Sequence, residues 1–182
     1  MSLPTPLVLE RCTIRDWRAD DAESIAHHAN DREVWLRVSD VFSYPYTIDN
    51  AHEFLARTMA NEPRTNFAIE VNGAAVGGIG LRLGSDIRRH TAEVGYWLGR
   101  EFWNCGIMSE ALTKFCEAAF AGFDLHRISA FVFSNNPTSG RVLEKAGFLF
   151  EGRMKHEVVK NGELLDSLVY GKTHLRVQDR QS

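Results

Sequence analysis

The sequence predicts a mixed α/β domain whose predominantly antiparallel sheet carries a strand-helix-strand unit at its centre. Two Asn-Gly dipeptides, at 72–73 and 161–162, each separate two strand-like runs, as in tight antiparallel hairpins. Between them, a strand-like run at 92–98 leads into an amphipathic stripe and then into another strand-like run at 127–133. The length of 182 residues suits one domain, so residues 1–182 are expected to form a single unit.

The first half of the chain is expected to contain one strand, two helices and a hairpin. Residues 7–15 are typical of an opening strand, and Asp20 with Glu23 predicts a capping box before the first helix. Thr47 precedes the second helix. The apolar stripes of the two helices are Ala22, Ile25, Ala26 and Ala29, and Ala51, Phe54, Leu55, Thr58 and Met59. The runs NFAIEV and AAVGGIGLRL then form the first hairpin, because Asn and Gly tolerate positive φ in its turn.

The second half of the chain continues the alternation. The strand at 92–98 feeds a helix through the segment REFWNCGI, and a further strand follows at 127–133. The stripe of that helix is Met108, Ala111, Leu112, Phe115 and Ala119. Asn136-Pro137 predicts the start of a short helix that ends at Gly147, a natural left-handed stop. The last hairpin joins HEVVK to ELLDSLVYG, which gives the order β-α-α-β-β-β-α-β-α-β-β.

Composition excludes several classes of protein. Hydrophobic residues at 44% and charged residues at 25% are ordinary for a globular domain, and a formal net charge of -3 gives no general attraction to nucleic acid. The cysteines at 12, 105 and 116 form no CxxC pair, and the histidines show no metal-ligand spacing. No apolar stretch has the length of a signal peptide or a membrane span. We therefore expect a cytoplasmic protein without a metal, nucleic-acid or membrane partner, and a homodimer is compatible with this sequence.

The segment from Trp103 to Ala111 lies between a strand and a helix. The first-turn N–H groups of a helix have no intrahelical partner and carry partial positive charge, so they can hold a phosphate. Gly106 would permit close approach, although the same pattern also fits an ordinary glycine turn capped by Ser109. Two other phosphate loops are excluded, because the chain has no GxxxxGK[ST] motif and the run GGIGLRLG lacks GxGxxG spacing.

Two separated motifs carry a family resemblance. EVGYWLGREFWNCGIMSEAL, followed by SNNPTSGRVLEKAGFLFEG, resembles the GCN5-related N-acetyltransferases (GNAT), in particular the ribosomal-protein N-terminal acetyltransferases. The resemblance extends to Arg15, to FSYPYTIDNAHEFL and to NGELLDSLVYG. It implies a sheet with helices on both faces, and transfer of an acetyl group from acetyl-CoA to an amine.

The resemblance also implies a coenzyme site. The pyrophosphate loop of the family, Q/R-x-x-G-x-G/A, places Trp103, Gly106 and Met108 at its three marked positions, of which only Gly106 matches. Because main-chain N–H groups make the contacts, the cradle is still expected in the backbone of Asn104, Cys105, Gly106, Ile107, Met108 and Ser109. Tyr96, Trp97 and Leu98 occupy the strand that in the family pairs with the pantetheine arm.

The catalytic groups are predicted from the same resemblance. Asn136 and Ser139 match the N-x-x-S motif near the thiol end of the coenzyme, although Asn136 also fits a plain N-cap. Many relatives place a tyrosine acid where this chain has Leu143, so Ser139 is the nearest candidate to assist the departing thiolate. Cys105 is not expected to act as a nucleophile, because the family transfers acetyl directly.

The general base is predicted less directly. Some relatives use a glutamate where this chain has Phe131, and others use a carboxylate near Glu93, which is alternatively an exposed strand residue. Glu157 and Asp166 are further candidates. Transfer is expected by direct amine attack, with the carbonyl polarised by main-chain N–H groups near Trp97 and Leu98.

The acceptor is implied to be a protein N-terminal α-amine, with small amines, amino acids or antibiotics as alternatives. The first-helix region and residues 36–48 are expected to shape that choice. A rival hypothesis is a non-catalytic acyl-CoA-binding sensor, which the absent tyrosine favours.

Overall fold

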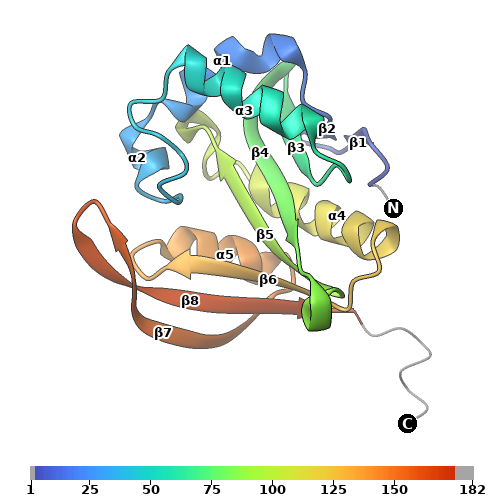
Figure 1. Cartoon of the computed structure of the whole chain (residues 1–182), viewed down its shortest axis with the longest axis vertical. Helices are drawn as coiled ribbons and strands as arrows, with labels where there is room; N and C mark the ends of the chain where they lie inside the picture. The colour runs from blue at the N-terminus through green and yellow to red at the C-terminus, as the bar shows by residue number, and fades with distance from the viewer. Residues whose placement is uncertain (1–2, 175–182) are drawn as a thin grey trace.

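A single eight-stranded sheet forms the centre of the computed structural model, which describes residues 3–174 (Figure 1). The predicted domain bounds of 1–182 thus include residues 1–2 and 175–182, which lie outside the described residues. The strands run in the order β1-β2-β3-β4-β5-β6-β8-β7, and only the β5–β6 pair is parallel. They are β1 (Leu7–Val8), β2 (Thr13–Arg15), β3 (Asn66–Val71), β4 (Ala74–Leu83), β5 (Thr91–Leu98), β6 (Arg127–Phe133), β7 (Leu149–Lys160) and β8 (Glu163–Thr173).

Helices cover both faces of the sheet, as predicted (Figure 1). They are α1 (Ala22–Ala29), α2 (Arg32–Trp35), α3 (Ile48–Ala60), α4 (Ile107–Gly122) and α5 (Pro137–Lys145). Because side chains alternate along a strand, Ala68 of β3 packs in one core with α1 and α3. Its neighbours Phe67 and Ile69 pack in the other core with α4, where the rings of Phe67 and Phe115 lie 5.9 Å apart. The mixed α/β class with a mostly antiparallel sheet is confirmed.

Two predictions for the N-terminal region are wrong. The expected single strand at 7–15 is two antiparallel strands, β1 and β2, joined by a turn in which Leu9 N–H donates to Cys12 O. The expected capping box of Asp20 and Glu23 is absent, and Asp21 accepts from the backbone N–H of Arg18 instead at 2.8 Å. The short helix α2 was not expected.

Both Asn-Gly hairpins are confirmed. Asn72 and Gly73 have φ of 51° and 83°, and Val71 pairs directly with Ala74. Asn161 and Gly162 have φ of 51° and 77° in the hairpin that joins β7 to β8. β7 is longer than the predicted run HEVVK because it begins at Leu149.

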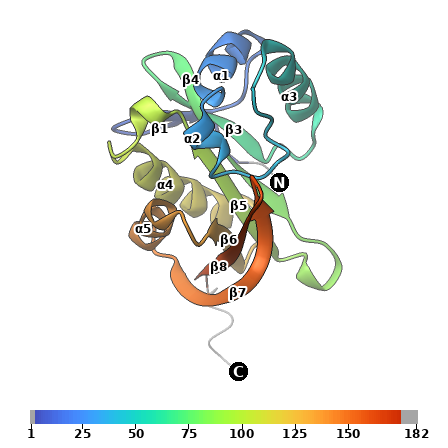
Figure 2. The ribbon, with the colours of Figure 1, turned by 90° about the vertical axis from the view of Figure 1, so that its left-hand side faces the viewer.

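The β7–β8 hairpin also reaches across the molecule. Its tip lies against the segment that follows α2 (Figure 2), where Lys160 Nζ contacts Asp40 Oδ1 at 2.5 Å. The same ammonium lies 4.0 Å from the ring centroid of Trp35. The C-terminal hairpin thus fixes the loop that precedes α3.

The sheet opens at its only parallel pair. β5 and β6 pair at Thr91–Arg127, Ala92–Ile128 and Glu93–Ser129, and beyond Glu93 the two strands diverge (Figure 1). β5 nevertheless continues to Leu98 and β6 to Phe133. One edge of β5 from Val94 to Leu98 therefore has no strand partner.

Among residues 3–174, no helix combines the length and apolar character needed to span a bilayer. The cytoplasmic location stays a prediction.

Candidate active site

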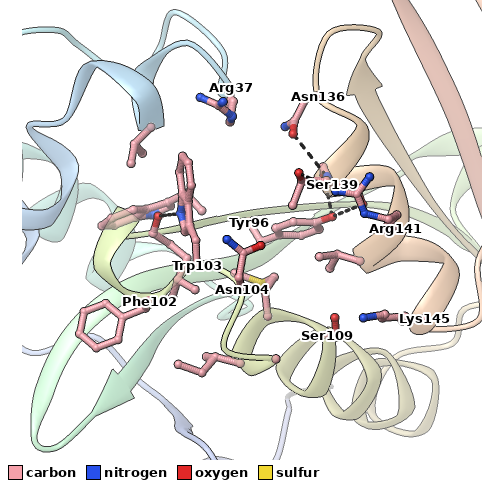
Figure 3. A pocket seen from close by; sticks show the side chains of 18 of the residues that line it. Arg37, Tyr96, Phe102, Trp103, Asn104, Ser109, Asn136, Ser139, Arg141 and Lys145 are labelled. Atoms are coloured by element: carbon pink, nitrogen blue, oxygen red, sulfur yellow. Dashed lines mark hydrogen bonds between the residues drawn. The ribbon is translucent and has the colours of Figure 1, made fainter.

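A cavity of about 260 Å³ lies where β5 and β6 diverge, bounded by α4, α5 and the end of α2 (Figure 3). Its lining includes all but one of the predicted coenzyme residues. These are Tyr96, Trp97, Leu98, Trp103, Asn104, Gly106, Ile107, Met108, Ser109, Asn136 and Ser139. The exception is Cys105, whose side chain is exposed and donates to Trp103 O at 3.4 Å. We call this space the first cavity.

The N-terminus of α4 faces the first cavity without a side-chain cap. Gly106 is the N-cap residue, with φ of 79°, and its carbonyl accepts from Glu110 N–H at 3.1 Å. Ser109 lies inside the helix, so the alternative of a turn capped by Ser109 is wrong. The first-turn N–H groups of this 16-residue helix remain available to an anion, and the helix dipole favours negative charge there.

The unpaired edge of β5 presents alternate main-chain groups to the opening. Gly99 N–H donates to Val76 O and Gly84 N–H donates to Thr91 O, so the odd-numbered residues of β5 direct their main-chain groups toward β4. The N–H groups of Tyr96 and Leu98 therefore face the opening, whereas that of Trp97 faces β4. Leu98 O is already occupied, because it accepts from Trp103 Nε1 at 2.7 Å.

Trp103 forms one wall of the first cavity. Besides its bond to Leu98 O, its ring lies 4.9 Å from the guanidinium carbon of Arg37. Arg37 in turn donates to Glu33 O at 2.6 Å and to Glu33 Oε2 at 2.8 Å. This chain thus places a fixed aromatic ring where the family motif has a glutamine or arginine.

Three polar side chains meet at the inner end of the first cavity (Figure 3). Asn136 is buried and caps α5, because its Oδ1 accepts from Ser139 N–H at 3.3 Å. Ser139 Oγ lies 2.8 Å from the phenol oxygen of Tyr96. Burial raises the pKa of Tyr96 well above its ordinary value, so the phenol keeps its proton. Leu143 is fully buried, and its position supplies no acid.

A second cavity of about 630 Å³ shares part of its lining with the first. The shared residues are Arg37, Val38, Tyr96, Trp97, Asn136 and Ser139. One face of α3 and the segment that contains Phe42 and Tyr46 form its walls. Gly80 and Gly95 pair across β4 and β5 on its floor, and a Cβ at Gly95 would meet nothing within 4 Å.

Two carboxylates line the second cavity among the described residues, Glu53 of α3 and Glu93 of β5. Glu93 lies at the last β5–β6 pair and contacts Arg82 Nη1 at 3.2 Å. Glu157 and Asp166 line neither cavity. Asp166 is instead bound to Arg153 and to the N–H of His156, and the His156 bond lowers its pKa most. Asp166 is therefore occupied in holding the bulged strand β7.

Sequence reasoning missed the basic side chains of the first cavity. Arg37, Arg141 and Lys145 line it, and the last two lie one turn apart on α5. The spacing of four residues in RVLEK was the available signal, because i and i+4 share a helix face. The other lining residues that were not predicted are Val34, Val38, Phe102, Thr138 and Val142.

Two groups of side chains within the described part of the chain have the spacing of metal ligands. They are His27, His28 and Glu101, and His90, Asp124 and His126. Neither group lines the two cavities. His90 Nδ1 lies 2.9 Å from Asp124 O and 3.2 Å from Asp124 Oδ2, so this nitrogen already has partners. The absence of a metal stays a prediction.

A family model described as an acetyltransferase (GNAT) domain matches residues 11–149. The N-acetyltransferase p20 of Bacillus licheniformis is 28% identical over 169 residues, which cover 90% of this chain and 93% of p20. An L-amino acid N-acetyltransferase of Escherichia coli is 29% identical over 161 residues, covering 87% of this chain and 96% of that protein.

A solved structure has the same fold. A ribosomal L7/L12 alpha-N-protein acetyltransferase in complex with coenzyme A superposes with a TM-score of 0.81 at 20% identity. The match covers 92% of this chain and 96% of that protein.

Proposed function

The chain belongs to the GNAT acetyltransferases and is an acyltransferase, and from this premise we propose that it moves acetyl from acetyl-CoA to a primary amine. In this proposal the first cavity holds the coenzyme and the second cavity holds the acceptor. The observation that carries the proposal is that the two cavities meet at Tyr96, Trp97, Asn136 and Ser139. A thioester and an amine that enter from opposite sides would come together there.

The chemistry of the first cavity fits coenzyme A. The uncapped N-terminus of α4 would hold the diphosphate through main-chain N–H groups, with Arg141 and Lys145 adding positive charge. The main-chain N–H and C=O of Tyr96 and the N–H of Leu98, free on the open edge of β5, would pair with the amides of the pantetheine arm. The likeness to a structure that contains coenzyme A supports this assignment.

Acetyl-CoA supplies a thioester carbonyl, and the residues of the chain orient and polarise it. We propose that Leu98 N–H donates to the carbonyl oxygen as negative charge develops, because Trp97 N–H faces β4. Ser139 assists the departing thiolate. Glu93 lies three residues from Tyr96 along β5, about 10 Å at the ordinary strand rise, so Glu93 would take the amine proton through water.

The acceptor is proposed to be a protein N-terminal α-amine. The ribosomal-protein acetyltransferase with the same fold supports this class, and the amino acid acetyltransferase relative favours a free amino acid as the second candidate. Turnover of acetyl-CoA should be followed with peptides, free amino acids and polyamines. Peptide turnover with no amino acid turnover is expected. The reverse would favour the second candidate, and background hydrolysis alone across the panel would favour a sensor.

Gly106→Val is expected to weaken acetyl-CoA binding by about tenfold or more, measured by titration calorimetry. A β-branched residue at φ of 79° carries about 1–3 kcal/mol of backbone strain, and its side chain would obstruct the phosphate cradle. Gly73→Val is the matched control, because Gly73 also has positive φ but lies in the distant β3–β4 turn. Equal loss of affinity in both variants would contradict the assigned cradle.

Glu93→Gln is expected to lower kcat/KM near neutral pH and to recover part of the rate as pH rises. Without its base, the amine reacts only in the fraction that solvent has already deprotonated, and this fraction grows with pH. The measurement is a pH-rate profile of both proteins on one verified acceptor. Glu53→Gln tests the competing carboxylate of the cavity. A changed profile for Glu53→Gln with an unchanged profile for Glu93→Gln would reassign the base.

A further inference from the structure

We propose that Tyr96 is a positioning residue whose phenol hydroxyl donates to Ser139 Oγ and thereby points the Ser139 proton toward the departing sulfur. The inference rests on the proposed function, because it assumes that Ser139 faces the thiol end of the coenzyme. It assigns to a side chain of β5 a role in the leaving-group step.

The contact joins two elements that are fixed independently. Tyr96 belongs to the part of β5 that has no β6 partner, and its side chain turns toward α4 and α5. Ser139 lies in the first turn of α5, where its N–H bonds the Asn136 side chain at 3.3 Å. The two hydroxyl oxygens are 2.8 Å apart across 43 residues of sequence. A cap and a sheet position therefore hold this pair at hydrogen-bond distance.

The direction of this hydrogen bond follows from the chemistry of the two hydroxyls. A phenol is a stronger acid than an aliphatic alcohol, so the phenol is the better donor and the serine oxygen the better acceptor. The other acceptor near the phenol, Ser139 O, is more distant at 3.4 Å. Burial raises the pKa of Tyr96, so the phenol stays protonated and remains a donor. Once Ser139 Oγ accepts from Tyr96, its own proton is free to point into the cavity.

The surroundings explain why the serine needs such a partner. Leu143 stands where many relatives place a tyrosine acid, and its side chain is fully buried. The other hydroxyl of the first turn, Thr138 Oγ1, accepts from Arg141 Nη2 at 3.1 Å. A lone serine hydroxyl can rotate among several orientations, and an accepted hydrogen bond removes those that would point its proton toward Tyr96.

The step balances without a change in the ionisation of Tyr96. The amine lone pair forms the C–N bond, and the C–S bond breaks with its electron pair on sulfur. Ser139 O–H donates a hydrogen bond to that sulfur while negative charge develops. The proton lost by the amine passes through Glu93 or water to solvent, from which the thiolate is reprotonated.

A double-mutant cycle tests the proposal on the enzyme with one verified acceptor. Tyr96→Phe is expected to lower kcat by about tenfold, with little change in acetyl-CoA affinity, because it removes one aligned hydrogen bond. In a Ser139→Ala background the same change should have almost no effect. Tyr170→Phe is the control, because it removes another buried phenol, which lines neither cavity and meets Glu144 at 3.4 Å. Additive losses in Tyr96→Phe and Ser139→Ala would overturn the proposal.

A second measurement does not depend on turnover. The thiol of bound coenzyme A, titrated by its thiolate ultraviolet absorbance against coenzyme-free protein, should have a lower pKa in the wild type than in Tyr96→Phe. Equal values in the two proteins would overturn the role of Tyr96. If wild-type protein neither binds coenzyme A nor turns over acetyl-CoA, the proposed function itself is wrong. If only Ser139→Ala loses activity, the proposed function stands and the inference falls.

Discussion

Arg15→Met is expected to lower the free energy of unfolding by about 3–5 kcal/mol, the cost of breaking a buried ion pair by removing one partner. Arg15 and Asp21 are 4% and 5% exposed, and two guanidinium nitrogens each bond one Asp21 oxygen at 2.7 Å. Arg15 also bonds Glu70 and donates to Asp16 O. The variant would leave the Asp21 carboxylate buried without its cation. Urea denaturation gives the value.

Two further variants show whether the loss comes from the unpaired charge. Arg64→Met removes an arginine that is half exposed and lies 3.4 Å from Asp16, so the loss should stay below about 1 kcal/mol. Arg15→Met combined with Asp21→Leu removes both buried charges and should recover much of the stability. Hydrogen bonds from Asp21 raise the pKa of Arg15 further, so its charge persists throughout the pH range of the experiment. Equal losses for Arg64→Met and Arg15→Met would contradict this account.

Elements governed by local chemistry were predictable from the sequence. The Asn-Gly turns at 72–73 and 161–162 need positive φ at both residues, and few other dipeptides provide it. Thr47 begins α3 with the cap that its sequence indicates, since its hydroxyl accepts from Asn50 N–H at 3.3 Å. In these cases the deciding interaction spans at most three residues.

Elements governed by distant contacts were not predictable. The turn that divides residues 7–15 is held by Glu110, whose carboxylate accepts from Glu10 N–H and Arg11 N–H, each at 3.0 Å. Its partner lies about a hundred positions away in sequence, so strand propensity alone favoured one continuous strand. Asp21, rather than Asp20, bonds Arg18 N–H and also holds Arg15, which a local capping pattern does not include.

The same distinction applies to the site. The resemblance carried residue names onto the loop before α4 and onto Asn136 and Ser139, because those positions follow motif spacing. It did not separate Trp97 from Leu98 as a donor, since this depends on which edge of β5 pairs with β4. Nor did it place the phenol of Tyr96 beside Ser139, because the contact depends on how α5 packs over β5.

Ser139→Ala is expected to lower kcat by about 100-fold, the lower end of the range for a positioned acid or hydrogen-bond donor. Affinity for acetyl-CoA should change little, because Ser139 supplies its N–H to Asn136 and this bond survives loss of the hydroxyl. The loss should appear in kcat and kcat/KM together, as for an interaction made mainly in the transition state. Steady-state kinetics with a verified acceptor and calorimetric titration with acetyl-CoA measure the two quantities.

The control for this prediction removes a hydroxyl from the same sheet without touching the site. Ser129 lies on β6, donates to Ala92 O at 3.3 Å and lines neither cavity. Ser129→Ala should keep wild-type kcat, so a loss confined to Ser139→Ala would come from the site and not from weakened strand pairing. A Ser139→Ala enzyme with wild-type kcat would show that the thiolate departs without a hydroxyl from α5. The leaving-group step would then depend on main-chain donors such as Leu98 N–H and on solvent.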